Sequence, residues 1–416
     1  MSHPSAGSPY PAFAPAPRPE NPNLINGSTT HGIVGRRAIR HPWELPMLGV
    51  GVLVTAVAYL LWLTMIVLVI VGLFTGDTRL FERLVSLPLM AQILVVVPLL
   101  PPILWWIRAM MYAQMRTSAV RMSPTQFPEG YRIVAEAAQR YGMRKVPDAY
   151  VAMGNGMVNA FAAGHGFRRF VVIYSDLFEV GGAPRDPDAL RFVIGHEVGH
   201  LAAGHASYFR LVFSNLMMQI PLLGPTYSRA QEYTADNFGY WSCPEGAPGV
   251  MGLLSGGKYL NAEVNVHELA DRAATDPSLF VHLANLQSSH PVTTWRAHAL
   301  RDRSKPGSMI IRPSGALFEG PLPAGSTFSG GYPSPADALA MLDRADQLRP
   351  AGHAGQFGRF NGADYSDRPS IRELQTSVPL LATRTSYAIP NGPYRDDARR
   401  TTPSFAPPPQ GPVSAG

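Results

Sequence analysis

A long run without any charged residue near the start of the chain limits its possible folds more than any other feature. Residues 45–76 hold no Asp, Glu, Lys or Arg, and most of them are aliphatic or aromatic. A helix needs roughly 20 apolar residues to cross the hydrocarbon core of a bilayer. A helix that is apolar on every side has no solvated face to offer in a small water-soluble domain. The sequence therefore predicts a transmembrane helix over this run.

A second stretch, residues 84–107, is also free of charge and long enough to cross a bilayer. Two adjacent tryptophans near its end are typical of a membrane interface. Several prolines interrupt it, and each proline removes a backbone hydrogen bond from a helix. Two interpretations stay open, a second transmembrane helix or a kinked or re-entrant segment. The residues concerned are Pro88, Pro98, Pro101, Pro102, Trp105 and Trp106.

The charges around the two stretches predict which side of the membrane the chain occupies. Arginines precede the first stretch and follow the second, whereas the connecting loop balances its two arginines with two acids. Because positive residues accumulate on the cytoplasmic side, we expect a hairpin with both ends in the cytoplasm. The strong preference for arginine over lysine is typical of high-GC bacterial genes, so we expect a multi-pass protein of a bacterial inner membrane. The flanking residues are Arg36, Arg37, Arg40, Arg108, Arg116 and Arg121.

Composition divides the chain into four parts. Proline and glycine concentrate near both ends, where apolar residues are too sparse to offset the entropy of ordering the chain. We predict a disordered Pro-rich tail over residues 1–43, a membrane anchor with two transmembrane helices over 44–121, and a folded domain over 122–304. Residues 305–416 are predicted to form a low-complexity, mostly disordered tail with one short helix over residues 335–348, capped by Ser334.

Charge and cysteine content exclude some classes of partner. The formal net charge is +6, but the arginines are scattered and no basic run or base-stacking module accompanies them. Nucleic acid is therefore excluded, and anionic lipid headgroups are the expected partner. The single cysteine, Cys243, cannot form an intrachain disulfide, which indicates a reducing compartment and a small buried thiol. The sequence says nothing about the oligomeric state.

The folded domain carries both helix and strand signals. Apolar residues recur at helical spacing over residues 128–142, and Gly142 ends the pattern. The runs "DAYVAM" and "FVVIYS" are rich in β-branched and aromatic residues and are bounded by turn residues, so they predict strands. An α+β domain is expected.

The string "VIGHEVGHLAAGH", residues 193–205, contains the pattern His-Glu-x-x-His. Asp186 and Pro187 precede it as a helix N-cap and a first-turn proline, so the pattern lies on a helix. On that helix His196 and His200 are about 40° apart and can bind one metal ion. Glu197 lies about 100° from His196, where it can reach a water molecule beside the metal and act as a general base.

Two glycines and a further histidine in this string call for an explanation. Gly195 and Gly199 each cost roughly 1 kcal/mol inside a helix. We expect them to form a smooth strip that another element approaches closely. The alternative is that these glycines have no packing role and are only tolerated in the helix. If the helix continued to His205, that residue would lie about 180° from His196. We therefore expect His205 to be solvated or to lie behind the ligands.

A third metal ligand is predicted in "SRAQEYTADNFG", residues 228–239. On a helix Glu232 and Asp236 share one face. Glu232 can bind the metal, while Asp236 accepts a hydrogen bond from a ligand histidine and orients its ring. Alone, this spacing is typical of a solvated helix face, but together with the capped helix of His196 and His200 it indicates one site.

These motifs resemble the HtpX-type membrane-bound zinc metallopeptidases, relatives of the CAAX prenyl endopeptidases among the gluzincins. "HEVGHLAAGH" and "SRAQEYTADNFG" are similar to the two metal motifs of that family, "NAFAAG" to its substrate-edge motif, and "HPVTTWRAHAL" to its His-Pro followed by Arg. The resemblance covers about residues 45–304. It implies a mainly helical, zincin-like domain with a small β-sheet behind a transmembrane hairpin, one Zn²⁺ per chain, endopeptidase activity and a site near the membrane.

The resemblance also implies where a substrate binds. Asn159, Ala160 and Phe161, together with the strand over residues 170–174, would form the wall of the cleft, because an exposed strand edge can hold an extended peptide. An ordinary core strand is the alternative. For His290 and Arg296 two roles stay open, stabilising the oxyanion or holding the local structure, and His290 could also occlude the metal. Unlike many HtpX-type sequences, residues 206–228 cannot hold a second transmembrane hairpin, and we expect an amphipathic or buried helix there.

The sequence therefore predicts a membrane-anchored, zinc-dependent endopeptidase that cleaves proteins at the cytoplasmic face of a bacterial inner membrane, with membrane proteins as substrates and quality control as the role. In that reading zinc is held by His196, His200 and Glu232, and Glu197 transfers the proton. A silent zinc-binding scaffold acting through the tails stays open as an alternative, and an adaptor without metal is a third. A structural zinc site does not need Glu197, whereas hydrolysis does.

Overall fold

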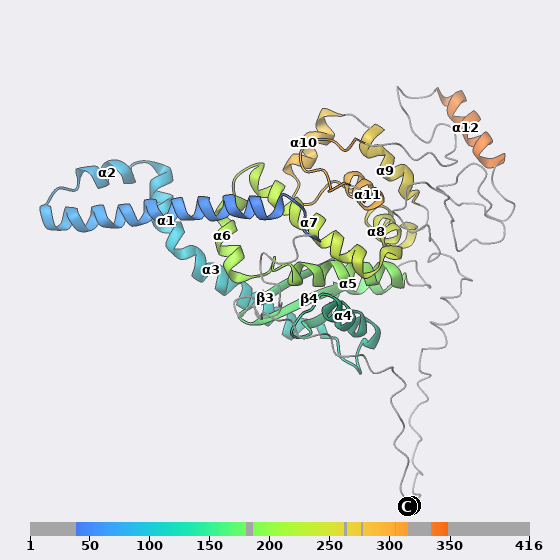
Figure 1. Ribbon diagram of the computed structural model, residues 1–416, viewed down its shortest axis with the longest axis horizontal. Helices are drawn as coiled ribbons and strands as arrows, with labels where there is room; N and C mark the ends of the chain where they lie inside the picture. The colour runs from blue at the N-terminus through green and yellow to red at the C-terminus, as the bar shows by residue number, and fades with distance from the viewer. Residues whose placement is uncertain are drawn as a thin grey trace, which may run out of the picture.

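The computed structural model describes residues 39–179, 186–261, 264–275, 278–303, 305–314 and 334–347. It shows a helical body from which one long helix projects (Figure 1). Most of the tails predicted over residues 1–43 and 305–416 lies outside the described residues. The described parts of these two ranges next to the body are packed on it, since His41 and Met309 are buried. The short helix predicted near the C-terminus is confirmed as α12 (Pro335–Gln347), and the Ser334 hydroxyl accepts a hydrogen bond from the Asp337 backbone N–H at 3.2 Å.

Helix α1 (Glu44–Thr75) projects from the body, α2 (Arg79–Val85) lies beside its far end, and α3 (Pro88–Ser118) returns to the body (Figure 1). Among the described residues two helices are long and apolar enough to cross a membrane, Glu44–Thr75 and Val95–Ser118. The short helix α2 was not expected, and it takes the first residues of the stretch predicted to be the second span. Leu73 and Phe74 leave 78% and 87% of their surface exposed. Such a row of exposed apolar side chains is stable in lipid and costly in water.

Helix α3 runs without a break through its prolines, and the choice between a second span and a kinked or re-entrant segment stays a prediction. Pro101 has no N–H to donate to the carbonyl four residues earlier, which is that of Val97. The Tyr59 hydroxyl of α1 donates to this Val97 carbonyl at 3.2 Å. A neighbouring helix therefore supplies the hydrogen bond that the proline removes, which is how membrane helices accommodate proline.

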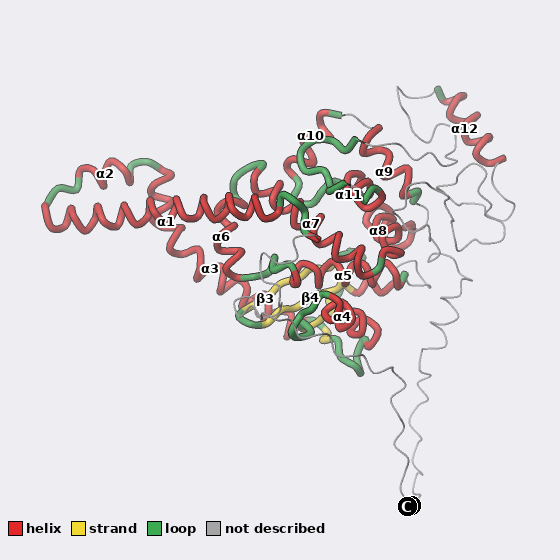
Figure 2. Tube along the Cα trace, viewed as in Figure 1, coloured by secondary structure: helices red, strands yellow, loops and turns green. Residues whose placement is uncertain are grey.

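A small mixed sheet stands on one side of the helical body (Figure 2). Its strands are β1 (Val120–Arg121), β2 (Asp148–Ala152), β3 (Ala160–His165) and β4 (Arg168–Tyr174), in the order β1-β2-β4-β3. β2 and β4 are parallel, and the other pairs are antiparallel. The two strands predicted from the sequence are confirmed as β2 and β4. The α+β class is therefore confirmed: the described residues form a mainly helical fold with a small four-stranded sheet.

The sheet is covered on both faces. Tyr150 and Phe170 face the C-terminal half of α3, where Met111 and Met115 pack against them. Val171 on the opposite face joins the main core, to which helices α4 (Pro128–Arg140) and α5 (Pro187–Ala202) contribute. The helix predicted over residues 128–142 is thus confirmed.

The remaining helices complete the body. They are α6 (Tyr208–Met218), α7 (Leu223–Ser242), α8 (Ala247–Leu260), α9 (Val266–Thr275), α10 (Leu279–Gln287) and α11 (Thr293–Arg301), with short 3₁₀ turns at Ser175–Glu179 and Pro244–Gly246. No further span lies between α5 and α7, where the short helix α6 is amphipathic as expected. Its Val212 is buried, whereas Phe209 and Phe213 are exposed.

Helices α5 and α7 pack face to face through the two glycines of the predicted strip. A Cβ atom added at Gly199 would lie 2.5 Å from the Cβ of Phe238 on α7. One added at Gly195 would lie 2.7 Å from the Cβ of Ser242 on the same helix. Only glycine allows the two backbones to come this close, so the expected close approach is confirmed. The packing matters because these two helices carry the predicted metal ligands.

Candidate metal centre

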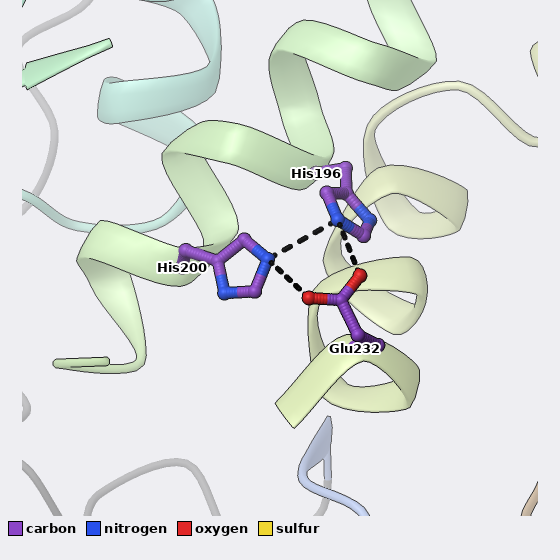
Figure 3. Close-up of side chains that lie close together, drawn as sticks. All are labelled: His196, His200 and Glu232. Carbon is purple, nitrogen blue, oxygen red and sulfur yellow. Dashed lines mark hydrogen bonds and ion pairs between the residues drawn. The ribbon is translucent and has the colours of Figure 1, made fainter. Parts of the chain in front are cut away.

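Helix α5 presents two histidines one turn apart. Asp186 caps the helix, since its Oδ1 accepts a hydrogen bond from the Ala189 backbone N–H at 2.9 Å, and Pro187 occupies the first position. The predicted cap is therefore confirmed. His196 and His200 point from α5 toward Glu232 of α7 (Figure 3). The three residues form a group whose ligand atoms all lie within 4.8 Å of one another.

The spacing of the three side chains fits a tetrahedral metal ion. The Nε2 atoms of His196 and His200 are 3.2 Å apart. Glu232 Oε1 lies 3.4 Å from His200 Nε2, and Glu232 Oε2 lies 3.5 Å from His196 Nε2. Ligand atoms held tetrahedrally at about 2.0–2.1 Å from zinc are separated by about 3.3 Å. Two imidazoles and a carboxylate at these separations suit zinc in both chemistry and distance.

Asp236 lies one turn beyond Glu232 on α7 and contacts His196 from behind. Its Oδ1 is 2.9 Å from His196 Nδ1, and the Arg296 guanidinium of α11 donates to Oδ2 at 2.8 Å. Burial alone would raise the pKa of Asp236, but the positive charge of Arg296 and the hydrogen bond with His196 lower it to about 2. Asp236 is therefore ionised and can accept the Nδ1–H of His196, which leaves Nε2 free toward the site.

The environment of His196 favours positive charge. Burial opposes protonation of the ring, yet the hydrogen bonds with Asp236 and Glu232 raise the pKa of His196 to about 9. Two carboxylates facing one ring create a negative potential, which would attract a metal cation to the same point.

Glu197 is buried and lines a cleft together with His196 and Glu232. Burial raises the pKa of its carboxyl, while the two histidines lower it and Glu232 raises it further. A carboxylate whose pKa is raised holds a proton more readily than one in water. This is the property that a general base needs if it must later return the proton.

Three strand and loop residues, Val158, Asn159 and Ala160, form one wall of the cleft, and apolar residues of α5 and α8 form the other. The exposed strand edge predicted for residues 170–174 is wrong, because β4 is paired with a neighbour on both sides. β3 is the edge strand on the side of the cleft, and β1 is the edge strand on the other side. Phe161 of β3 packs against Phe170 on the face away from the cleft, so its side chain does not line it.

His290 and Arg296 both line the cleft. His290 Nε2 lies 3.5 Å from Glu232 Oε2, and its side chain is 62% exposed. Arg296 is buried and bound by Asp236 through two nitrogens, so its charge is directed at Asp236. The geometry favours the holding role for Arg296 among the alternatives left open by the sequence.

His205 lies beyond the end of the helix that carries the two predicted ligands. Helix α5 ends at Ala202, and Gly204 adopts a φ of +78° that turns the chain back. His205 is buried as a result, and its Nδ1 lies 2.7 Å from the Nδ1 of His200, behind the ligand. Of the two expected positions, solvated or behind the ligands, the second is confirmed.

Sequence reasoning missed a buried charge cluster behind His205. Glu44, the first residue of α1, lies with its Oε1 3.2 Å from His205 Nε2 and accepts hydrogen bonds from Arg40 and Arg210. Glu44 and Arg210 have no exposed side-chain surface. The only available signal was a single acid at the border of an apolar run, which the charge pattern alone does not connect to a residue 161 positions away.

The family model described as Peptidase family M48 matches two overlapping segments, residues 124–218 and 206–304. Residues 124–304 match this peptidase family. The resemblance drawn from four motifs is thereby confirmed, and the chain is a metallopeptidase, a hydrolase of peptide bonds. No curated protein and no solved structure matches it. M48 peptidases depend on zinc, and in this member His196, His200 and Glu232 form the group that could hold the ion.

Proposed function

We propose that this M48 peptidase is a membrane-anchored, zinc-dependent endopeptidase that cleaves protein substrates at the cytoplasmic face of a bacterial inner membrane. The observation that carries the proposal is the triangle of His196, His200 and Glu232 at tetrahedral spacing, with Glu197 lining the cleft beside it. A site with three protein ligands is typical of catalytic zinc, because the fourth position stays open. Membrane proteins in need of removal are the proposed substrates.

Each residue has one task in this proposal. Zinc held by the triangle would polarise the substrate carbonyl and lower the pKa of a water molecule to about 7. Glu197 takes a proton from that water and returns it to the leaving amine, which its burial and raised pKa support. Asp236 orients His196, and Arg296 keeps Asp236 ionised and in place.

An extended peptide would bind along the free edge of β3. Tyr174 donates its N–H to the Asn159 carbonyl, so Asn159 and Tyr174 form a hydrogen-bonded pair. In an antiparallel ladder such pairs alternate, which directs the N–H and C=O groups of Ala160 and Ala162 away from β4. The N–H of Ala160 donates to its neighbour's Oδ1 at 2.9 Å, and a substrate carbonyl could replace this contact. Main-chain hydrogen bonds of this kind demand little of the substrate sequence.

The two apolar helices support a membrane hairpin with the metal centre on the cytoplasmic side. The exposed apolar surface of α1 and α3 needs lipid, and arginines flank the pair at both ends. Because Glu44 begins α1 and contacts His205 behind the ligand His200, the site lies close to the end of a proposed span. Proximity to the bilayer favours substrates that are themselves in the membrane, and quality control is the role that the family resemblance suggests.

The scaffold alternative has no observation in its favour. A structural zinc site has four protein ligands and needs no carboxylate in a cleft. Glu197 is buried beside the ligands and open to that cleft, which hydrolysis requires and a structural site does not.

The test compares the purified full chain with Glu197→Gln. Zinc content and cleavage of an unfolded protein are measured for both in detergent. We expect equal zinc content and at least a 100-fold slower cleavage by the variant, since general base catalysis contributes about 10²–10⁴-fold. A zinc-loaded wild type that cuts no offered protein would support the scaffold, and a wild type without zinc affinity would refute the metal site itself.

A further inference from the structure

A chain of polar contacts runs from the proposed metal ligand His200 to the first residue of α1. The Nδ1 atoms of His200 and His205 are 2.7 Å apart, and His205 Nε2 lies 3.2 Å from Glu44 Oε1. His205 and Glu44 are both buried. The chain therefore joins the metal centre to a helix that we propose to span the membrane, without passing through solvent.

The positions of the protons along this chain follow from the chemistry of each group. A histidine that binds a metal through Nε2 needs a lone pair there, so the ring proton of His200 must be on Nδ1. The Nδ1 of His205 must then accept that proton in a hydrogen bond. A neutral ring carries one N–H, so the proton of His205 is on Nε2 and is donated to Glu44. An ionised carboxylate can only accept, so Glu44 determines the direction of the whole chain.

The Glu44 carboxylate is held in place by residues from other elements. Arg210 of α6 donates to Oε1 at 2.5 Å, and Arg40, which precedes α1, donates to the same oxygen. Thr234 of α7 donates to Oε2 at 2.6 Å. Buried and paired with two guanidinium groups, Glu44 remains an anion and a fixed acceptor.

We propose that Glu44 is a positioning residue that fixes, through His205, the tautomer of His200 in which Nε2 is free to bind a metal ion. This inference rests on the proposed metal site. It makes the metal affinity of the centre depend on a residue of α1, which itself touches neither the metal ligands nor the cleft. The packing of α1 against the body therefore affects the metal affinity of the centre.

The test measures the zinc dissociation constant of the full chain in detergent by competition with a chelator. His205→Leu removes the acceptor for His200 and should weaken zinc binding by about 10–100-fold, the range for residues that orient a metal-bound histidine. His205→Gln offers a carbonyl to His200 and an amide N–H to Glu44, so it should bind zinc more tightly than His205→Leu. Tyr227→Phe is the control, because it removes only the hydroxyl that accepts from Arg210 at the far end of the cluster. We expect it to lower the melting temperature and to leave zinc affinity unchanged.

The role of Glu44 itself is tested with a double variant, Glu44→Gln with Arg40→Met, which keeps the net charge of the cluster. A glutamine can donate as well as accept, so it no longer dictates the tautomer of His205. Zinc affinity between that of the wild type and that of His205→Leu is expected. Wild-type affinity in either His205→Leu or the double variant would overturn the inference, and so would an equal loss in Tyr227→Phe. A wild type that binds no zinc would instead refute the proposed metal site, so the two failures are distinguishable.

Discussion

Replacing Gly199 by alanine should damage the metal centre more than it damages the fold. The added Cβ would lie 2.5 Å from the Cβ and 2.9 Å from the Cγ of Phe238. Carbon atoms pack at about 3.5–4.0 Å, so α5 and α7 would have to move apart by about 1 Å. The Cβ of Phe238 cannot turn away as the end of a flexible side chain could, because it is attached to the α7 backbone.

Two opposing effects set the size of the stability change. Overpacking a close contact costs about 1–3 kcal/mol, whereas alanine in place of glycine gains roughly 1 kcal/mol within a helix. The net loss of unfolding free energy is therefore about 0–2 kcal/mol. The catalytic loss is larger, since α5 carries His196 and His200 while α7 carries Glu232. A displacement of about 1 Å at a reacting centre costs on the order of 100-fold in rate.

The assays are thermal unfolding, zinc affinity and cleavage of an unfolded protein. Gly49→Ala is the matched control, because a Cβ at that position of α1 meets no atom within 4 Å. The control should keep its zinc affinity and its cleavage rate. Wild-type zinc affinity and activity in Gly199→Ala would refute the reasoning that the close approach of α5 and α7 sets the ligand spacing.

Three further predictions concern the substrate edge, the cysteine and the topology. Ala162→Pro removes an N–H that points outward from the edge strand β3, a position where proline is tolerated. The KM for an extended peptide should rise severalfold while the zinc content stays unchanged. An unchanged KM would exclude binding along β3. Burial raises the pKa of the Cys243 thiol to about 12, so the thiol stays protonated at pH 8. After treatment with an alkylating reagent, mass spectrometry should find Cys243 unmodified in the folded chain and alkylated in the denatured chain. Rapid alkylation of the native chain would contradict this. Since that thiol is inert, a cysteine introduced as Thr78→Cys should be labelled by an impermeant thiol reagent on intact spheroplasts, and labelling only after lysis would refute the proposed hairpin.

Local patterns carried most of the prediction of the metal centre. His196 and His200 follow from four-residue spacing behind a capped helix, and Glu232 and Asp236 follow from the same spacing on a second helix. The two glycines indicated that another element approaches the first helix closely, and the structure identifies this element as α7. Each of these inferences needs only the geometry of one helix, which the sequence encodes within a few residues.

Contacts between distant segments could not be predicted in the same way. Glu44 lies 161 positions from His205, and no periodicity connects them. The edge position of β3 depends on strand order, which is set by packing of the whole sheet on α3 and α5. For His205 the sequence left two positions open, because it did not show that the helix ends before Gly204, whose positive φ allows the turn that brings the ring back to His200.

The buried charge cluster also predicts that the peptidase domain does not fold independently of α1. A truncated chain that begins at Met122 lacks Glu44, so Arg210, which is fully buried in the full chain, keeps Tyr227 as a partner but loses its carboxylate. Breaking a buried ion pair by removing one partner costs about 3–5 kcal/mol, a large part of the stability of an average domain. The truncation also removes Met47 and Leu48, which pack against Met217 and Tyr227.

We therefore expect the truncated chain to be aggregated or poor in zinc, as measured by size-exclusion chromatography and metal analysis. Arg210→Met in the same truncated chain removes the unpaired charge and should recover part of the soluble fraction, which separates the electrostatic cost from the lost apolar contacts. If the truncated chain with Arg210 intact is monomeric, stable and fully loaded with zinc, the cluster does not couple α1 to the metal centre. If the truncated chain is soluble only when it also carries Arg210→Met, then α1 contributes the counter-charge for Arg210. The body of the peptidase cannot supply that charge for itself.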